Sequence, residues 1–161
     1  MSVTRIVLLA AWLGAALFFG AVVAPAAFGV LRSFGLPNAS EIAGSIVTRT
    51  LGVINVAGFV IALLLLLTAL LRRHAQTKLS LIIELVCIGL IALTTAVGHW
   101  FIAARMRAIR AALELPIDQI ATSDARRIEF NALHGYSVNA LGIAMIAALV
   151  ALVVIGRSVR Q

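Results

Sequence analysis

Four long apolar segments alternate with short polar ones along the chain. They run from Ile6 to Leu31, from about Val47 to Leu71, from Leu79 to Ala104 and from Phe130 to Gly156. With a helical rise of about 1.5 Å per residue, each segment is long enough to cross a hydrocarbon layer of about 30 Å. Strands are excluded because lipid leaves open sheet edges without hydrogen bonds. The pattern predicts an all-α fold, a four-helix transmembrane bundle that forms one domain over residues 1–161.

The polar residues before the second and third apolar segments predict how these helices start. Asn38 followed by Glu41 has the spacing of a capping box, so the second helix is expected to begin near Ala39, ahead of its membrane segment. The polar hairpin at residues 72–78 is short, which makes the second and third helices antiparallel neighbours.

The third connection, residues 105–129, is the only sizeable one. Its sequence predicts a short amphipathic helical connection: a basic continuation of the third helix, a break at Pro116, and a new helix start capped near Ser123 or Asp124. Opposite charges along it predict local ion pairs. The Ala24-Pro25-Ala26 sequence imitates a signal cleavage site, but the first apolar segment exceeds the ~7–15 residues of a signal core, so we expect it to be retained.

Composition places the chain in lipid. Hydrophobic residues make up 63% of the 161 residues and charged residues 12%, whereas soluble domains have about 45–50% and about 25%. The net charge of +7 does not indicate a nucleic-acid partner, because the basic residues lie between apolar segments and form no known nucleic-acid-binding module. We expect an integral membrane protein whose principal partner is the lipid bilayer.

Basic residues at the segment ends bear on orientation. Six lie on the side of the two termini and the second loop, and seven lie on the other side. The tightly flanking charges of the short second loop favour both termini in the cytoplasm, and we expect the chain in a bacterial inner membrane.

Ionisable residues inside an apolar segment need a partner or a purpose. On the third helix, Glu84, Thr95 and His99 share one stripe. Glu84 and His99 are 15 residues apart, about 22 Å along a helix, so they cannot form one site. Glu84 is expected to pair with an arginine or to be protonated, with a proton-relay role as the alternative. Asn55 and Asn139 are further intramembrane polar residues, and Asn139 is expected to bond a neighbouring helix.

Two histidines are the candidate ligands. His99 lies about 9 Å inside the end of the third helix, and His134 lies about 7.5 Å inside the start of the fourth. Because the helices are antiparallel, both rings are expected near the same membrane face, with Thr95 and Ser137 as neighbouring hydroxyls. Such a pair could bind a transition metal such as copper, or hold a haem iron from both sides. Interfacial rings with ordinary hydrogen bonds, or proton transfer, are the alternatives.

Two other classes of function are also consistent with these residues. A transport or tolerance factor would use Glu84, Thr95 and His99 along a polar path between helices. A structural subunit would dock a membrane partner or a second copy through alanine and glycine ridges, such as Ala140, Ala144 and Ala148. No nucleophile–base pair or paired carboxylates are visible, which argues against an enzyme. Cys87 is the single cysteine, so an internal disulfide is impossible.

Several residues carry a family resemblance. Trp12, Gly14, Pro25 and Phe28 in the first helix, then Phe130, His134, Gly135 and Ser137 in the fourth, resemble the transmembrane-protein-205-like family, whose bacterial members are described as a domain of unknown function. The resemblance spans most of the chain, and the phrase in the fourth helix is its most specific part. It implies four membrane helices and a long polar third connection. Its eukaryotic members are linked to drug or metal tolerance.

A more distant similarity is to copper-resistance-D-like membrane proteins, some of which bind b-type haem through intramembrane histidines. It implies a ligand role for His99 and His134, and this implication is an analogy from the fold. Asn139 lies closer to the histidine than is expected from the eukaryotic members, so no role is carried over to it.

The topology gives a first prediction. A reporter fused after Gln161 and a reporter inserted within residues 72–78 should lie on the same side of the membrane, because two crossings, the third and the fourth segment, lie between them. Opposite signals would mean that the third or the fourth segment does not span.

Overall fold

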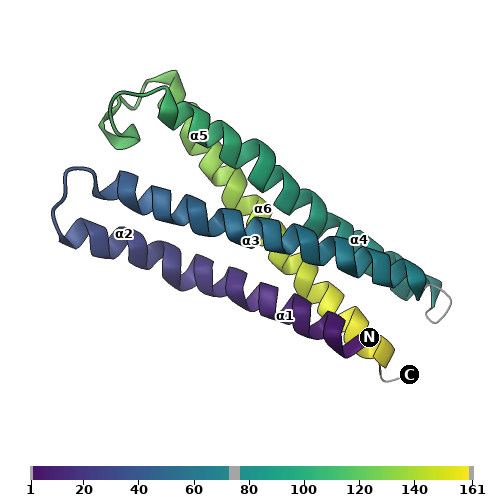
Figure 1. Ribbon diagram of the computed structural model, residues 1–161. Coiled ribbons are helices and arrows are strands. Elements are labelled where there is room, and N and C mark those ends of the chain that lie inside the picture. The colour runs from purple at the N-terminus through teal and green to yellow at the C-terminus, as the bar shows by residue number, and fades with distance from the viewer. Residues whose placement is uncertain (1, 73–76, 160–161) are drawn as a thin grey trace.

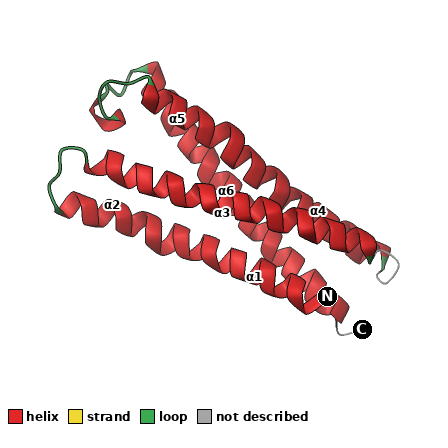
Figure 2. Ribbon diagram, viewed as in Figure 1, coloured by secondary structure: helices red, strands yellow, loops and turns green. Residues whose placement is uncertain are grey.

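The chain folds as four long helical rods. The computed structural model describes residues 2–72 and 77–159, and within these ranges it contains helices and no strand (Figures 1 and 2). The first rod joins α1 (Ser2–Phe18), the π-helical turn η1 (Phe19–Val23) and α2 (Ala24–Ser33), and the second is α3 (Ala39–Leu71). The third rod joins α4 (Lys78–Ala96), the π-helical turn η3 (Val97–Ile102) and α5 (Ala103–Ala111), and the fourth is α6 (Ala125–Val159). All four are long and apolar enough to cross a membrane, which confirms the predicted all-α bundle.

Neighbouring rods run antiparallel, as the short connections predict. The start of α1, the end of α3, the start of α4 and the end of α6 lie together at what we call the termini end (Figure 1). Residues 34–38 and 112–124 lie at the opposite end, the loop end. Thr77 caps α4 by accepting a hydrogen bond from the Ser80 amide at 3.3 Å. The rest of the predicted hairpin, residues 73–76, lies outside the described residues.

Two details at the loop end differ from the sequence expectation. Helix α3 does begin at Ala39, but the Asn38 side chain makes no capping hydrogen bond. Glu41 turns instead toward Arg110 of α5, so an ion pair replaces the capping box. The third connection is also less helical than predicted. Its basic part continues α5 to Ala111, and after Pro116 it holds only a single 3-10 turn, η4 (Ile117–Gln119).

Small residues let α6 lie close to its neighbours. Ala144, Ala148 and Ala151 are completely buried, together with Ile155 one turn further on. In lipid, packing replaces the hydrophobic drive between helices, and small side chains allow more of it. The ridge expected to dock a partner is therefore used inside the bundle at Ala144 and Ala148.

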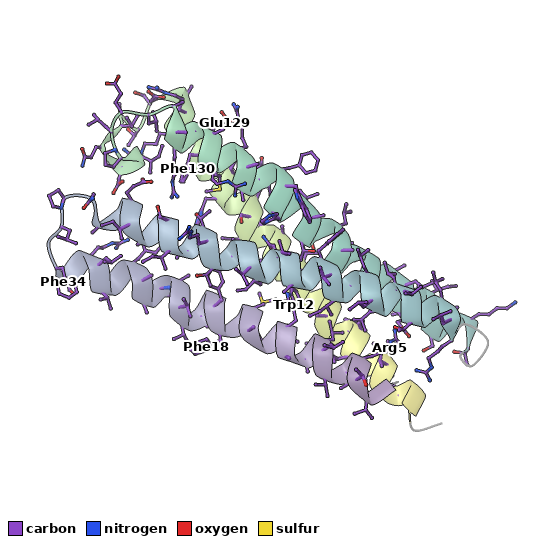
Figure 3. All side chains as sticks on the ribbon, viewed as in Figure 1. Arg5, Trp12, Phe18, Phe34, Glu129 and Phe130 are labelled. Atoms are coloured by element: carbon purple, nitrogen blue, oxygen red, sulfur yellow. The ribbon has the colours of Figure 1, made fainter. Side chains whose placement is uncertain are left out.

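Trp12 fixes the position of α1 against α3 (Figure 3). Its indole Nε1 donates a hydrogen bond to the Ile54 carbonyl at 2.9 Å. Gly58 leaves the space for the ring, because a Cβ there would stand 2.6 Å from the same Nε1 atom. Real Cβ contacts are not that short, so a larger residue at position 58 would push the two helices apart.

A buried ion pair joins three helices near the termini end. Arg5 of α1 pairs with Glu84 of α4, and the same Nη2 atom donates to the Leu65 carbonyl of α3 at 3.2 Å. Arg5 is 2% exposed and Glu84 is fully buried. The expectation that an arginine neutralises Glu84 is confirmed, and the arginine comes from the first helix.

Removal of one member of this pair should be more harmful than removal of both. Glu84→Leu strands the Arg5 charge among apolar side chains, so we expect the free energy of unfolding to fall by about 3–5 kcal/mol. The double variant Arg5→Leu/Glu84→Leu should lie within about 1 kcal/mol of the parent. Glu84→Gln should remain folded. Thermal unfolding of all four proteins in bilayers checks this, and a Glu84→Leu protein as stable as the parent would contradict it.

The start of α6 gives a pH prediction. The Asp124 carboxylate accepts hydrogen bonds from the Arg126 amide at 2.8 Å and from the Arg126 guanidinium at 2.7 Å. These interactions lower the pKa of Asp124 from 3.8 to about 2. Because the folded pKa is depressed, the stabilisation is complete above pH 3.8 and is lost as the pH falls through about 2. A carbon NMR titration of the Asp124 carboxyl should show this low midpoint, and Arg126→Gln should return it toward 3.8. An unchanged midpoint in the variant would contradict the assignment.

Candidate functional site

His99 lies on a turn where the third rod departs from regular α-helix. The π-helical turn η3 covers Val97–Ile102, and such turns occur frequently at functional sites. Asn55 of α3, which is 4% exposed, packs against this turn. A Cβ at Gly98 would stand 3.1 Å from its Nδ2 atom, so the absence of a side chain at Gly98 lets the amide approach the η3 backbone.

A membrane-facing groove runs between α3 and the η3–α5 segment beside His99. Its volume is about 550 Å³. We call it the His99 groove, and it is lined by Thr48, Arg49, Gly52, Val53, Val56, Ala57, His99 and Arg107. Val53 is 70% exposed, so the groove opens on the outer surface of the bundle.

The His99 ring has an unmet hydrogen-bonding requirement. Its Nδ1 atom is buried and has no hydrogen-bond partner in the part of the chain that the structure describes. The ring stands edge-on to Trp100, with centroids 4.9 Å apart, and faces Gly52, where a Cβ would be 3.7 Å from Nδ1. A buried ring nitrogen without a partner is costly, and such groups are rare in folded proteins.

Two arginines give the groove a cationic end. Arg49 of α3 and Arg107 of α5 both line it and both are exposed. Arg107 follows His99 by eight residues, about 12 Å along a helix, toward the loop end. Within the described ranges no ion pair engages either guanidinium. The groove therefore combines apolar walls, one imidazole and two positive charges.

His134 occupies a different cavity. The ring is exposed on α6 and lines a cavity of about 230 Å³ at the loop end, together with Arg110, Asp118 and Asn131. This cavity and the His99 groove share Thr48 as a lining residue. No hydrogen bond, ion pair or ring contact between His99 and His134 is present in the described structure.

The remaining predicted site residues do not line the cavity of either histidine. Thr95 is 1% exposed, and its hydroxyl donates to the Ile91 carbonyl of its own helix at 2.6 Å. Ser137 is half-buried and Asn139 is exposed on α6. Neither Thr95 nor Glu84 lines the cavities described above. Over residues 2–72 and 77–159, no group of three or more His, Cys, Asp or Glu residues is placed to hold a metal ion.

Arg110 is a junction that the sequence analysis did not find. Its Nε atom lies 3.3 Å from the Glu41 carboxylate, and its guanidinium lies over the Phe130 ring, 5.0 Å from the centroid. Gly44 makes room for it, because a Cβ there would meet Nη2 at 2.4 Å. The three contacts link α5 to α3 and α6. No spacing rule could have paired positions so far apart in the chain.

A second ion pair joins α5 to α6 near the loop end. Arg105 contacts the Glu129 carboxylate through Nε at 2.6 Å and through Nη2 at 3.0 Å. Such a bidentate pair fixes orientation as well as distance. Ion pairs were predicted for this connection, and the structure confirms them.

One comparison with known proteins gives a family. The family model described as "Domain of unknown function (DUF4149)" matches residues 7–114, which is 108 of the 161 residues. Among curated proteins and among solved structures, none matches the chain. The matched range contains the His99 groove and ends before α6. The phrase around His134, the most specific part of the resemblance described above, therefore lies outside it.

Proposed function

The chain belongs to the family described as a domain of unknown function, DUF4149, and we propose from its own residues that it binds an amphipathic, anionic cofactor of the b-type haem class in the His99 groove. The observation that carries the proposal is the buried Nδ1 atom of His99, which has no hydrogen-bond partner among the described residues and stands beside a groove of about 550 Å³. The protein would then serve electron transfer or metal handling in the membrane.

The residues present fit such a group. The imidazole of His99 is free of hydrogen bonds within the described structure, so it is available as an iron ligand. Arg49 and Arg107 are available for two propionates, since arginine matches carboxylate geometry. Val53 and Val56 line the groove and would cover the apolar macrocycle. When bound, haem supplies reversible one-electron chemistry, and its axial ligand and the burial of the site tune its potential.

A bare copper ion is supported less well. Copper bound by protein alone needs several donors around one point. In the described ranges no cluster of three or more His, Cys, Asp or Glu residues exists. A porphyrin brings four nitrogens of its own, so one histidine is enough to anchor it.

Ligation by His99 alone is favoured over the pair of His99 and His134. The two rings line different cavities, and His134 is exposed. The transport alternative is also weakened, because Glu84 is occupied by Arg5 and the Thr95 hydroxyl by its own helix. The proposal assigns no catalytic step to the protein.

The proposal also includes a location and an orientation. A bacterial inner membrane with both termini in the cytoplasm would place the His99 groove toward the outer leaflet, because the loop end lies opposite the termini. The resemblance that the sequence suggests to transmembrane-protein-205-like and copper-resistance-D-like proteins implies a haem or metal role, and it enters only as an analogy.

Absorption spectroscopy tests the proposal. Protein expressed with ample haem precursor should show a Soret band that His99→Ala abolishes and His134→Ala leaves in place. Gly52→Leu should also abolish it by filling the groove beside the ring. Arg49→Gln/Arg107→Gln should weaken haem binding about ten-fold, equivalent to ~1.4 kcal/mol.

The matched controls separate loss of the site from loss of the fold. Each variant should insert and show the helical circular-dichroism spectrum of the parent. A colourless parent protein would refute haem binding. A band that persists in His99→Ala and disappears in His134→Ala would move the ligand to the other cavity.

A further inference from the structure

One face of helix α6 points away from the rest of the bundle in the described structure. Gly135, Asn139, Gly142 and Ile146 recur at spacings of four, three and four residues, so they share one face of the helix. The buried alanines of α6, Ala144, Ala148 and Ala151, define the opposite face. Ile146 is 67% exposed, in keeping with this arrangement.

Asn139 places a polar amide on this face near mid-membrane. The apolar helix extends over Ala125–Arg157, and Asn139 lies about 3 Å from its midpoint along the axis. The side chain is exposed, and no hydrogen bond to it exists within the described structure. Hydrocarbon cannot supply one, so the amide carries an unmet requirement at the depth where this is most costly.

Several threonine hydroxyls in the spans meet this requirement within their own helices. The hydroxyls of Thr50, Thr68 and Thr94 donate to the carbonyl four residues earlier in their own helices. Asn55, at a similar depth on α3, is buried against η3. The Asn139 side chain has neither an intrahelical hydrogen bond nor a buried position. It differs from these residues because its amide faces away from the bundle.

The backbone around Asn139 is accessible to another helix. A Cβ at Gly135 or Gly142 would meet nothing within 4 Å. Glycines one turn before and one turn after the amide would let a second helix approach closely enough for a hydrogen bond at Asn139.

We propose that two copies of this chain pair through the outward face of α6, with the Asn139 amides hydrogen-bonded to each other. In two copies that share one orientation, α6 helices related by a two-fold axis along the membrane normal run parallel and place each residue near its own counterpart. A carboxamide has both a donor and an acceptor and is therefore complementary to itself. Residues 130–156 contain no Asp, Glu, Lys or Arg, so no charge repulsion opposes the contact.

Cysteine cross-linking in membranes locates the interface. In a Cys87→Ala background, Ile146→Cys should form an intermolecular disulfide on mild oxidation. Leu93→Cys is the matched control, because Leu93 is 60% exposed on another helix, near the middle of the third rod, Lys78–Ala111. Equal cross-linking of both variants, or cross-linking of Ile146→Cys only to a different protein, would overturn the proposal.

Energy transfer between labelled copies in vesicles tests the amide itself. As the protein-to-lipid ratio is varied, the parent should show a monomer–dimer transition. Asn139→Leu should raise the dimer dissociation constant about five- to thirty-fold, the range expected for one interhelical hydrogen bond in lipid. Asn139→Gln, which keeps the carboxamide, should retain most of the affinity. A parent that stays monomeric at every ratio, or an unchanged constant in Asn139→Leu, would overturn the proposal. The result is independent of haem binding.

Discussion

Hydrocarbon offers no hydrogen bonds, and this constraint governs where every polar side chain in the bundle is placed. Arg5 and Glu84 neutralise each other at a point where three helices meet. The Trp12 indole reaches a carbonyl of the neighbouring helix. The buried Thr95 hydroxyl uses a carbonyl of its own helix. Packing of small residues then completes a fold in which the polar groups determine which helices are neighbours.

His99 and Asn139 have no hydrogen bond within the described structure, and in the Arg5–Glu84 pair the Arg5 Nε and Nη1 atoms and the Glu84 Oε2 atom also have none. The Nδ1 atom of His99 is buried without a partner beside a groove. The Asn139 amide is exposed on the outward face of α6 with no partner in the described structure. An unmet group in lipid is unfavourable unless something outside the chain completes it. For His99 the surroundings fit an anionic amphipathic cofactor, and for Asn139 they fit a second copy. The description of the family to which the chain belongs names neither role.

The sequence predicts most of the architecture because the lengths of the apolar segments and the positions of the polar residues between them determine it. The four spans, the antiparallel neighbours, the start of α3 at Ala39 and the break at Pro116 follow from local patterns. The pairing of Glu84 with an arginine follows from the cost of a buried charge. Which arginine it is does not follow, because Arg5 is 79 residues away in the chain.

The candidate site is harder to predict from the sequence for the same reason. His99 and its stripe could be identified, but the groove depends on α3 residues that carry no recognisable motif, notably Gly52. The matched depth of His99 and His134 was read from loop positions alone. The depth of a residue in the membrane does not determine the direction in which its side chain points around the helix axis. The His99 and His134 side chains point in different directions and line different cavities. The π-helical turn at η3 contributes to this rotation, and the spacing of apolar residues does not predict such a turn.

The central claim is that an unmet polar group in the bundle marks a binding position. Nitrogen NMR of the histidine side chains in bilayers, with and without added haem, tests it most directly. In the haem-free protein the His99 ring should show nitrogen shifts of an imidazole without a protein hydrogen bond. On addition of haem, the His99 signals should broaden and shift, while those of His134 stay in place. Signals of His99 that already indicate a hydrogen-bonded ring, and that do not respond to haem, would contradict the account.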